Sequence, residues 1–171
     1  MSRFQTLTPS DMSREEFVTA FADIYEHSPW VAEQAYDLGM NETLDHIGAL
    51  HKRMSQVFLS ADPDTQLALI NAHPDLAGKA ATRGELTAAS TSEQAGAGIQ
   101  DCTPNEFERF VHFNAAYKAK FGFIFIMAVK GSDRHKILAS FEERMDNTRE
   151  QEFNRAIAEI NKIAMFRLQE M

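Results

Sequence analysis

The chain has 171 residues, of which 44% are hydrophobic and 25% charged, a composition typical of one soluble globular domain covering residues 1–171. No run of residues approaches the roughly 18 apolar positions of a membrane span, and the formal charge of −8 opposes binding to nucleic acid. The only cysteine, Cys102, excludes an internal disulfide and favours a reducing compartment.

Capping residues followed by proline, or by Glu or Gln at the third helical position, indicate where helices begin in the first half of the chain. The helix that begins after Asp62 must end close to His73, because Pro74 disfavours helical geometry in the residue before it. The predicted helices begin at Ser13, at Ser28–Pro29 with an end near Gly39, at Asn41 with a face through Phe58, and at Asp62–Pro63.

The second half carries similar signals. Further helices are predicted from Thr103–Pro104 to Gly122, after Ser132–Asp133, and from Thr148 to near the C-terminus. The aromatic and β-branched run Phe121–Val129 is typical of a strand, but no second strand is available to pair with it. We therefore expect an irregular or helical core segment that presents backbone groups to a ligand. The prediction is an all-α, single-domain compact bundle of about seven to eight helices.

Residues 71–100 are rich in glycine and small side chains, which suit a close backbone approach better than helix packing. His73 lies within this stretch, between a helix end and a turn fixed by proline. Histidine is the side chain suited to proton transfer near neutral pH, although a partly exposed or capping histidine is the commoner case.

Ser90 and Glu93 have the spacing of a capping box, in which the glutamate would bond to the backbone of Ser90. That structural role competes with a catalytic one for Glu93. The neighbouring Gln94 offers a donor and an acceptor that suit an amide-like ligand, or equally a solvated helix surface.

Arg167 follows Ile160 and Ile163 on the apolar stripe of the last helix. It either extends its charge to water or, if buried, needs an anion such as a substrate carboxylate. His46 and His51 are five residues apart, so they diverge by about 140° on a helix and make a poor metal pair. With no metal, nucleotide or thiol motif in the sequence, we expect chemistry without a metal or cofactor.

Several motifs resemble the 2-oxo-4-hydroxy-4-carboxy-5-ureidoimidazoline (OHCU) decarboxylases of urate degradation, in order and over nearly the whole chain. One difference from the family is Ile124, where proline is usual. The motifs are Glu26–Trp30, Ala72-His-Pro-Asp-Leu-Ala-Gly-Lys79, Ser90-x-x-Glu93-Gln94, Asn114-x-x-Tyr117, Phe121-Gly-Phe-x-Phe-Ile126 and Ile163-Ala-x-x-Arg167-Leu168.

The resemblance implies an all-α homodimer without cofactor that converts OHCU to (S)-allantoin with loss of carbon dioxide. It implies that His73 is the catalytic acid and base and that Glu93 orients the imidazole or the substrate. The substrate-binding residues that it implies are Pro74, Ser90, Gln94, the backbone of Phe125, Ile126, Met127, Ala128 and Val129, and Arg167 beside the leaving carboxylate.

Two other functions remain open from the sequence. One is a non-catalytic helical interaction module on the same scaffold, and the other is a hydrolase or isomerase of a related ureido compound. The expected partners are a small-molecule substrate and a second copy of the chain, with neither nucleic acid nor membrane. The C-terminal Gln169-Glu-Met171 lacks a peroxisomal signal, so we expect a cytoplasmic location.

Overall fold

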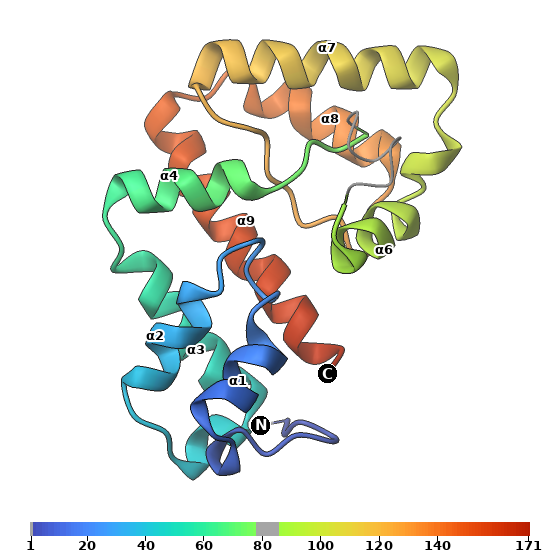
Figure 1. The fold of residues 1–171 in the computed structure, drawn as a ribbon. Helices are drawn as coiled ribbons and strands as arrows, with labels where there is room; N and C mark the ends of the chain where they lie inside the picture. The colour runs from blue at the N-terminus through green and yellow to red at the C-terminus, as the bar shows by residue number, and fades with distance from the viewer. Residues whose placement is uncertain (1, 78–85) are drawn as a thin grey trace. The chain divides into compact units, whose positions relative to one another are not determined.

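The computed structural model describes residues 2–77 and 86–171, so Gly78 and Lys79, the end of the Ala72–Lys79 motif, lie outside the described residues. The described part contains eight α-helices, three short 3-10 helices and no strand, which confirms the all-α prediction (Figure 1). No helix in these two ranges is long and apolar enough to cross a membrane. The 3-10 helices are Pro9–Asp11, Glu42–Asp45 and Ile99–Asp101.

The chain divides into two compact units. The first consists of Met1–Ala72 with Ile160–Met171, and the second of His73–Glu159. Helix α9 (Arg149–Gln169) therefore contributes its first half to the second unit and its second half to the first.

The first unit consists of four helices and the end of α9. The helices are α1 (Arg14–Phe21), α2 (Trp30–Asp37), α3 (Ile47–Leu59) and α4 (Pro63–Ala72). Helix α1 begins with the predicted capping box of Ser13 and Glu16, and Asp62 caps α4 by accepting hydrogen bonds from the backbone and hydroxyl of Thr65, each at 2.8 Å. In α1 the inward-facing Phe17 and Phe21 pack with ring centroids 4.7 Å apart.

The helix predicted from Asn41 through Phe58 is wrong at its start. Asn41 caps only the 3-10 helix Glu42–Asp45, and α3 begins at Ile47 after an extended His46. Long-range bonds explain the interruption, because Asp45 accepts from the backbone N–H and the hydroxyl of Ser10 at 2.8 and 2.9 Å. The Ile47 N–H also donates to the carbonyl of Ser2, so tertiary contacts override the local helical pattern here.

The second unit contains α6 (Ala88–Gly96), α7 (Pro104–Phe121), α8 (Arg134–Arg144) and the first half of α9. Helix α7 begins with a capping box of Thr103 and Glu106 and ends at Gly122, which has the left-handed φ of 80° that favours glycine. Asp133 caps α8 by accepting from the backbone N–H groups of His135 and Lys136. These boundaries agree with the sequence signals.

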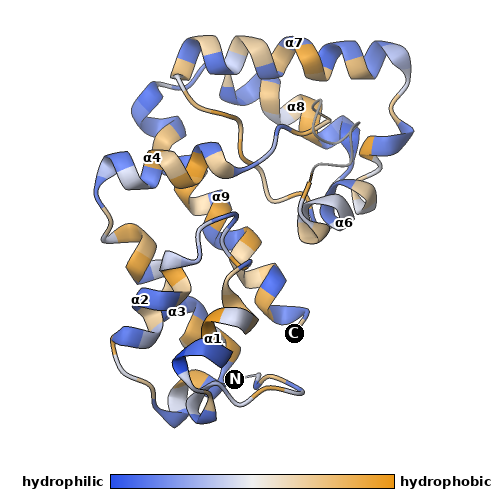
Figure 2. Cartoon of the chain, viewed as in Figure 1, coloured by the Kyte–Doolittle hydropathy of each residue, from blue (hydrophilic) through white to orange (hydrophobic). Residues whose placement is uncertain are grey.

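The segment between α7 and α8 has no regular secondary structure from Ile124 to Val129, as predicted. It is apolar along most of its length (Figure 2). Phe123, Ile124, Phe125 and Ile126 are all buried. The Phe125 ring stacks on Phe141 of α8 with centroids 3.7 Å apart, so this irregular segment forms part of the core of the second unit.

The capping box of α7 gives a stability prediction. Thr103→Ala removes the side-chain acceptor of the Glu106 N–H, so we expect the free energy of unfolding in urea to fall by about 1 kcal/mol. Asn105→Ala, at an exposed position in the same first turn, is the matched control and should change it by less than about 0.5 kcal/mol. Equal losses in the two variants would contradict a specific capping contribution.

Candidate active site

His73 stands at the end of α4 and is the first residue of the second unit. Helical structure stops at Ala72, directly before it, as Pro74 requires. His73 is only 8% exposed, so the partly exposed histidine considered from the sequence is not what the structure has. Its imidazole is attached to a short, irregular turn rather than to a helix.

Two buried amides hold that turn. Gln94 of α6 accepts a hydrogen bond from the Ala77 N–H at 3.2 Å and donates to the Asp75 carbonyl at 3.3 Å. Asn114 of α7 donates to the Leu76 carbonyl at 2.9 Å. The bonds matter because Ala77 has a left-handed φ of 55°, a conformation that costs a non-glycine residue about 1–2 kcal/mol.

Ser90, Glu93 and Gln94 lie on α6, and the structure corrects how this helix starts. The N-cap is Thr87, whose hydroxyl accepts from the Ser90 N–H, so Ser90 is already the third helical residue. Ser90 and Glu93 therefore do not form the capping box that their spacing predicted. The solvated alternative for Gln94 is also wrong, because Gln94 is 5% exposed and Ser90 is 4% exposed.

Helix α7 contacts both the turn after His73 and the Phe125–Val129 segment. Asn114 binds the turn after His73, and Tyr117 packs against Phe125 with ring centroids 5.3 Å apart. Asn114 and Tyr117 are three positions apart, which is a rise of about 4.5 Å along the helix. The His73–Ala77 turn and the start of the Phe125–Val129 segment therefore lie against adjacent positions of α7.

A buried ion pair beside the Phe125–Val129 segment was not predicted from the sequence. Arg144 of α8 donates from Nε to Glu152 of α9 at 2.8 Å, and from Nη1 to the carbonyl of Ile126 at 2.7 Å. The signal that singled out Arg167 was also present here, since Arg144 follows Ile137 and Phe141 on the apolar stripe of its helix.

Arg167 belongs to the first unit, where it is 6% exposed and does not extend to water. Its Nη2 pairs with Glu26 at 2.8 Å and its Nη1 donates to the carbonyl of Asp23 at 3.1 Å. The anion that a buried arginine requires is thus supplied, at least in part, by the chain itself. A position beside the substrate carboxylate stays a prediction for this residue.

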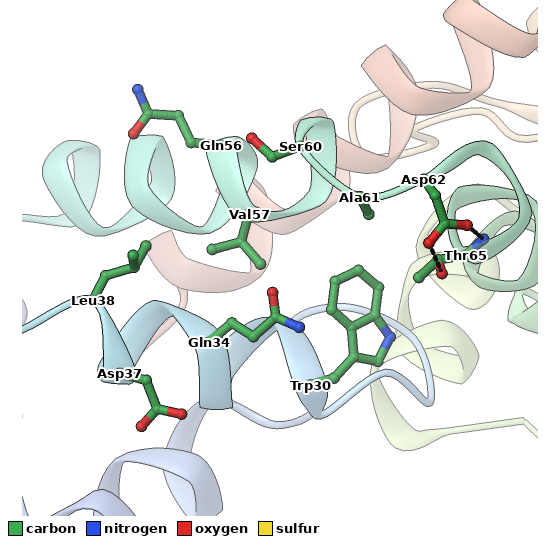
Figure 3. Close-up of a pocket in the computed structure, with 10 residues that line it drawn as sticks. All are labelled: Trp30, Gln34, Asp37, Leu38, Gln56, Val57, Ser60, Ala61, Asp62 and Thr65. Carbon is green, nitrogen blue, oxygen red and sulfur yellow. Dashed lines mark hydrogen bonds between the residues drawn. The ribbon is translucent and has the colours of Figure 1, made fainter.

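A groove of about 550 Å³ lies in the first unit, where Trp30, Gln34 and Val57 point into it (Figure 3). It contains none of the predicted site residues. Its two carboxylates have structural partners: Arg14 lowers the pKa of Asp37, and the hydrogen bonds from Thr65 lower that of Asp62. The groove therefore offers no group suited to accept and return a proton near neutral pH.

The described residues offer neither a metal site nor a reactive thiol. Within the described ranges, no group of three or more His, Cys, Asp or Glu side chains could hold a metal ion. Partial burial, with a contribution from Glu106, raises the pKa of the Cys102 thiol, so this cysteine is a poor nucleophile. His73 combines burial and acid–base chemistry with an irregular backbone.

The chain is similar to known proteins over its whole length. It is 38% identical to a 2-oxo-4-hydroxy-4-carboxy-5-ureidoimidazoline decarboxylase of Halalkalicoccus jeotgali over 171 residues, which cover 100% of this chain and 93% of the relative. It is 40% identical to the protein of the same name from Haloferax volcanii over 156 residues, which cover 91% of this chain and 89% of the relative.

A solved structure and a family model agree with these relatives. A crystal structure of (S)-allantoin synthase matches with a TM-score of 0.76 and 31% identity, and the match covers 95% of this chain and 51% of that one. The family model described as OHCU decarboxylase matches residues 10–169, a range that includes His73, Glu93, the Phe125–Val129 segment and Arg167. The chain therefore belongs to the OHCU decarboxylase family.

Proposed function

We propose that this chain catalyses the decarboxylation of OHCU to (S)-allantoin in the degradation of urate. The observation that carries the proposal is the match, over the full length of the chain, to a decarboxylase of that name at 38% identity. The buried histidine on an irregular, hydrogen-bonded turn supports it, because such a group can move a proton within a site shielded from water.

The substrate supplies its own electron sink, since the carbon that bears the carboxylate adjoins a C=N bond. The bond to the carboxylate carbon breaks, carbon dioxide leaves, and the electron pair moves into the C=N group, whose nitrogen takes up a proton. The adjacent hydroxyl then loses its proton, and a proton is delivered to one face of the ring carbon. One proton is consumed overall, and the face that receives it determines the (S) configuration.

The protein has to orient the substrate and exchange protons with it. His73 accepts the hydroxyl proton and returns a proton to carbon, and Glu93 orients the imidazole or the substrate. Glu93 lies three residues after the buried Ser90 on α6, one position before the amide that holds the turn, and this proximity supports the assignment. Pro74, Ser90, Gln94 and the backbone of Phe125–Val129 bind the ring and the ureido group, and Arg167 faces the leaving carboxylate.

We also propose that residues 1–171 act as one functional domain, that the chain forms a homodimer, and that it is cytoplasmic. The family match from residue 10 to residue 169 includes both structural units, which supports a single functional domain. Phe107 and Val111, one turn apart on α7, are 37% and 52% exposed and offer an apolar surface for a second subunit.

The activity itself is the first prediction. When OHCU is generated in situ from urate, the purified chain should accelerate the appearance of (S)-allantoin, followed by its circular dichroism. Racemic allantoin formed at the spontaneous rate would exclude the proposed reaction and favour a non-catalytic interaction module. A different ureido product, identified by mass spectrometry, would instead indicate a hydrolase or isomerase.

The role of His73 can be tested separately. His73→Ala removes the proposed acid and base, so kcat should fall by about 10²–10⁴-fold while the far-ultraviolet circular dichroism stays helical. His112→Ala replaces an exposed histidine on α7 and should leave kcat unchanged. Wild-type kcat in a folded His73→Ala variant would remove this residue from the mechanism.

The catalytic role of Glu93 and the capping of α6 can be tested separately, because the residue that caps α6 is Thr87. Glu93→Gln should lower kcat by about tenfold or more and leave the urea midpoint unchanged. Thr87→Ala should do the reverse, losing about 1 kcal/mol of stability at unchanged kcat, since it removes the acceptor of the Ser90 N–H. A Glu93→Gln variant that loses stability but retains its kcat would contradict the catalytic assignment.

A further inference from the structure

The ion pair of Arg144 and Glu152 is among the most completely enclosed polar features of the second unit, with side-chain exposures of 2% and 0%. The carboxylate of Glu152 is bonded at both oxygens. Oε1 accepts from Arg144 and from the hydroxyl of Tyr117 at 2.7 Å, and Oε2 accepts from Asn147 at 2.9 Å. The opposite charge of Arg144 and three hydrogen bonds hold the carboxylate in place, and the carboxylate in turn holds the guanidinium.

Arg144 contacts the segment after α7 at two consecutive residues. Its Nη1 donates to the Ile126 carbonyl at 2.7 Å, and its guanidinium carbon lies 4.2 Å from the centroid of the Phe125 ring. A hydrogen bond fixes the direction of a carbonyl, and a cation over a ring fixes the plane of the ring. One side chain thus restrains both a main-chain group and a side chain in a segment with no helix or sheet of its own.

We propose that Arg144 is a positioning residue that fixes the backbone of Phe125–Val129 in the geometry that binds substrate, with Glu152 holding Arg144 in place. The inference rests on the proposed function, in which this backbone recognises the ring and the ureido group. A planar guanidinium suits the task because it can bond to Glu152 and Ile126 at once while it stacks on Phe125. A lysine ammonium keeps the charge but has neither the fork nor the flat face.

The decisive variant is therefore Arg144→Lys. It should raise KM by about tenfold or more through displacement of the binding backbone, and change kcat by less than about threefold, because His73 is untouched. Hydrogen exchange of backbone amides in the peptide from Phe123 to Lys130 should become at least about tenfold faster.

Tyr117→Phe is the matched control. It removes another hydrogen bond to Glu152 and keeps the aromatic ring, so it tests whether any weakening of the same buried cluster has the same effect. Its KM and the exchange of the Phe123–Lys130 peptide should stay within about twofold of wild type, even if its stability falls as much as that of Arg144→Lys.

A double variant, Arg144→Met with Glu152→Gln, covers the case in which Arg144→Lys does not fold, because removing both charges leaves no unpaired ion in the core. It should show the same rise in KM and the same faster exchange. Unchanged KM in either folded variant, or an equal rise in Tyr117→Phe, would overturn the proposal. If the wild-type chain does not process OHCU, the proposed function fails on that result alone, and unchanged exchange of the Phe123–Lys130 peptide would separately overturn the positioning role.

Discussion

Buried backbone that belongs to no helix or sheet must find hydrogen-bond partners in side chains, and this requirement organises the second unit. In the described part of that unit, the turn after His73 and the segment Ile124–Val129 are such stretches. Amides from α6 and α7 bond to the first, and the guanidinium of α8 bonds to the second. Polar side chains on the inward faces of these helices thus hold the irregular backbone in its conformation.

Two arginines lie on apolar helix stripes, and each is neutralised within its own unit. Arg144 pairs with Glu152 and Arg167 pairs with Glu26, both at 2.8 Å. Neutralisation suits the proposed reaction, because an unpaired cation beside the substrate carboxylate would stabilise the ground state before carbon dioxide leaves. In the proposed role of Arg167, its guanidinium would orient the carboxylate through N–H groups while Glu26 offsets most of its charge.

The sequence was most informative where structure depends on local chemistry. The starts of α1, α4, α7 and α8, and the end of α4 before Pro74, follow from capping residues and prolines alone. The break before α3 and the cap of α6 did not follow, because Asp45 is drawn to Ser10 and because Thr87 and Ser90 are both plausible caps. His73 and Glu93 were predicted as site residues from motifs. Arg144 and Glu152 could not be predicted in this way, because their contacts join α7, α8, α9 and the segment after α7.

The turn beside His73 has a consequence for how such proteins diverge. Its shape is imposed through peptide groups of Asp75, Leu76 and Ala77 by amides that lie 17 to 38 positions later in the chain. Part of the information that shapes this turn is therefore stored outside it, at Gln94 and Asn114. Descendants of this sequence that lost either distant amide would lose these restraints on the turn, although no residue next to His73 had changed.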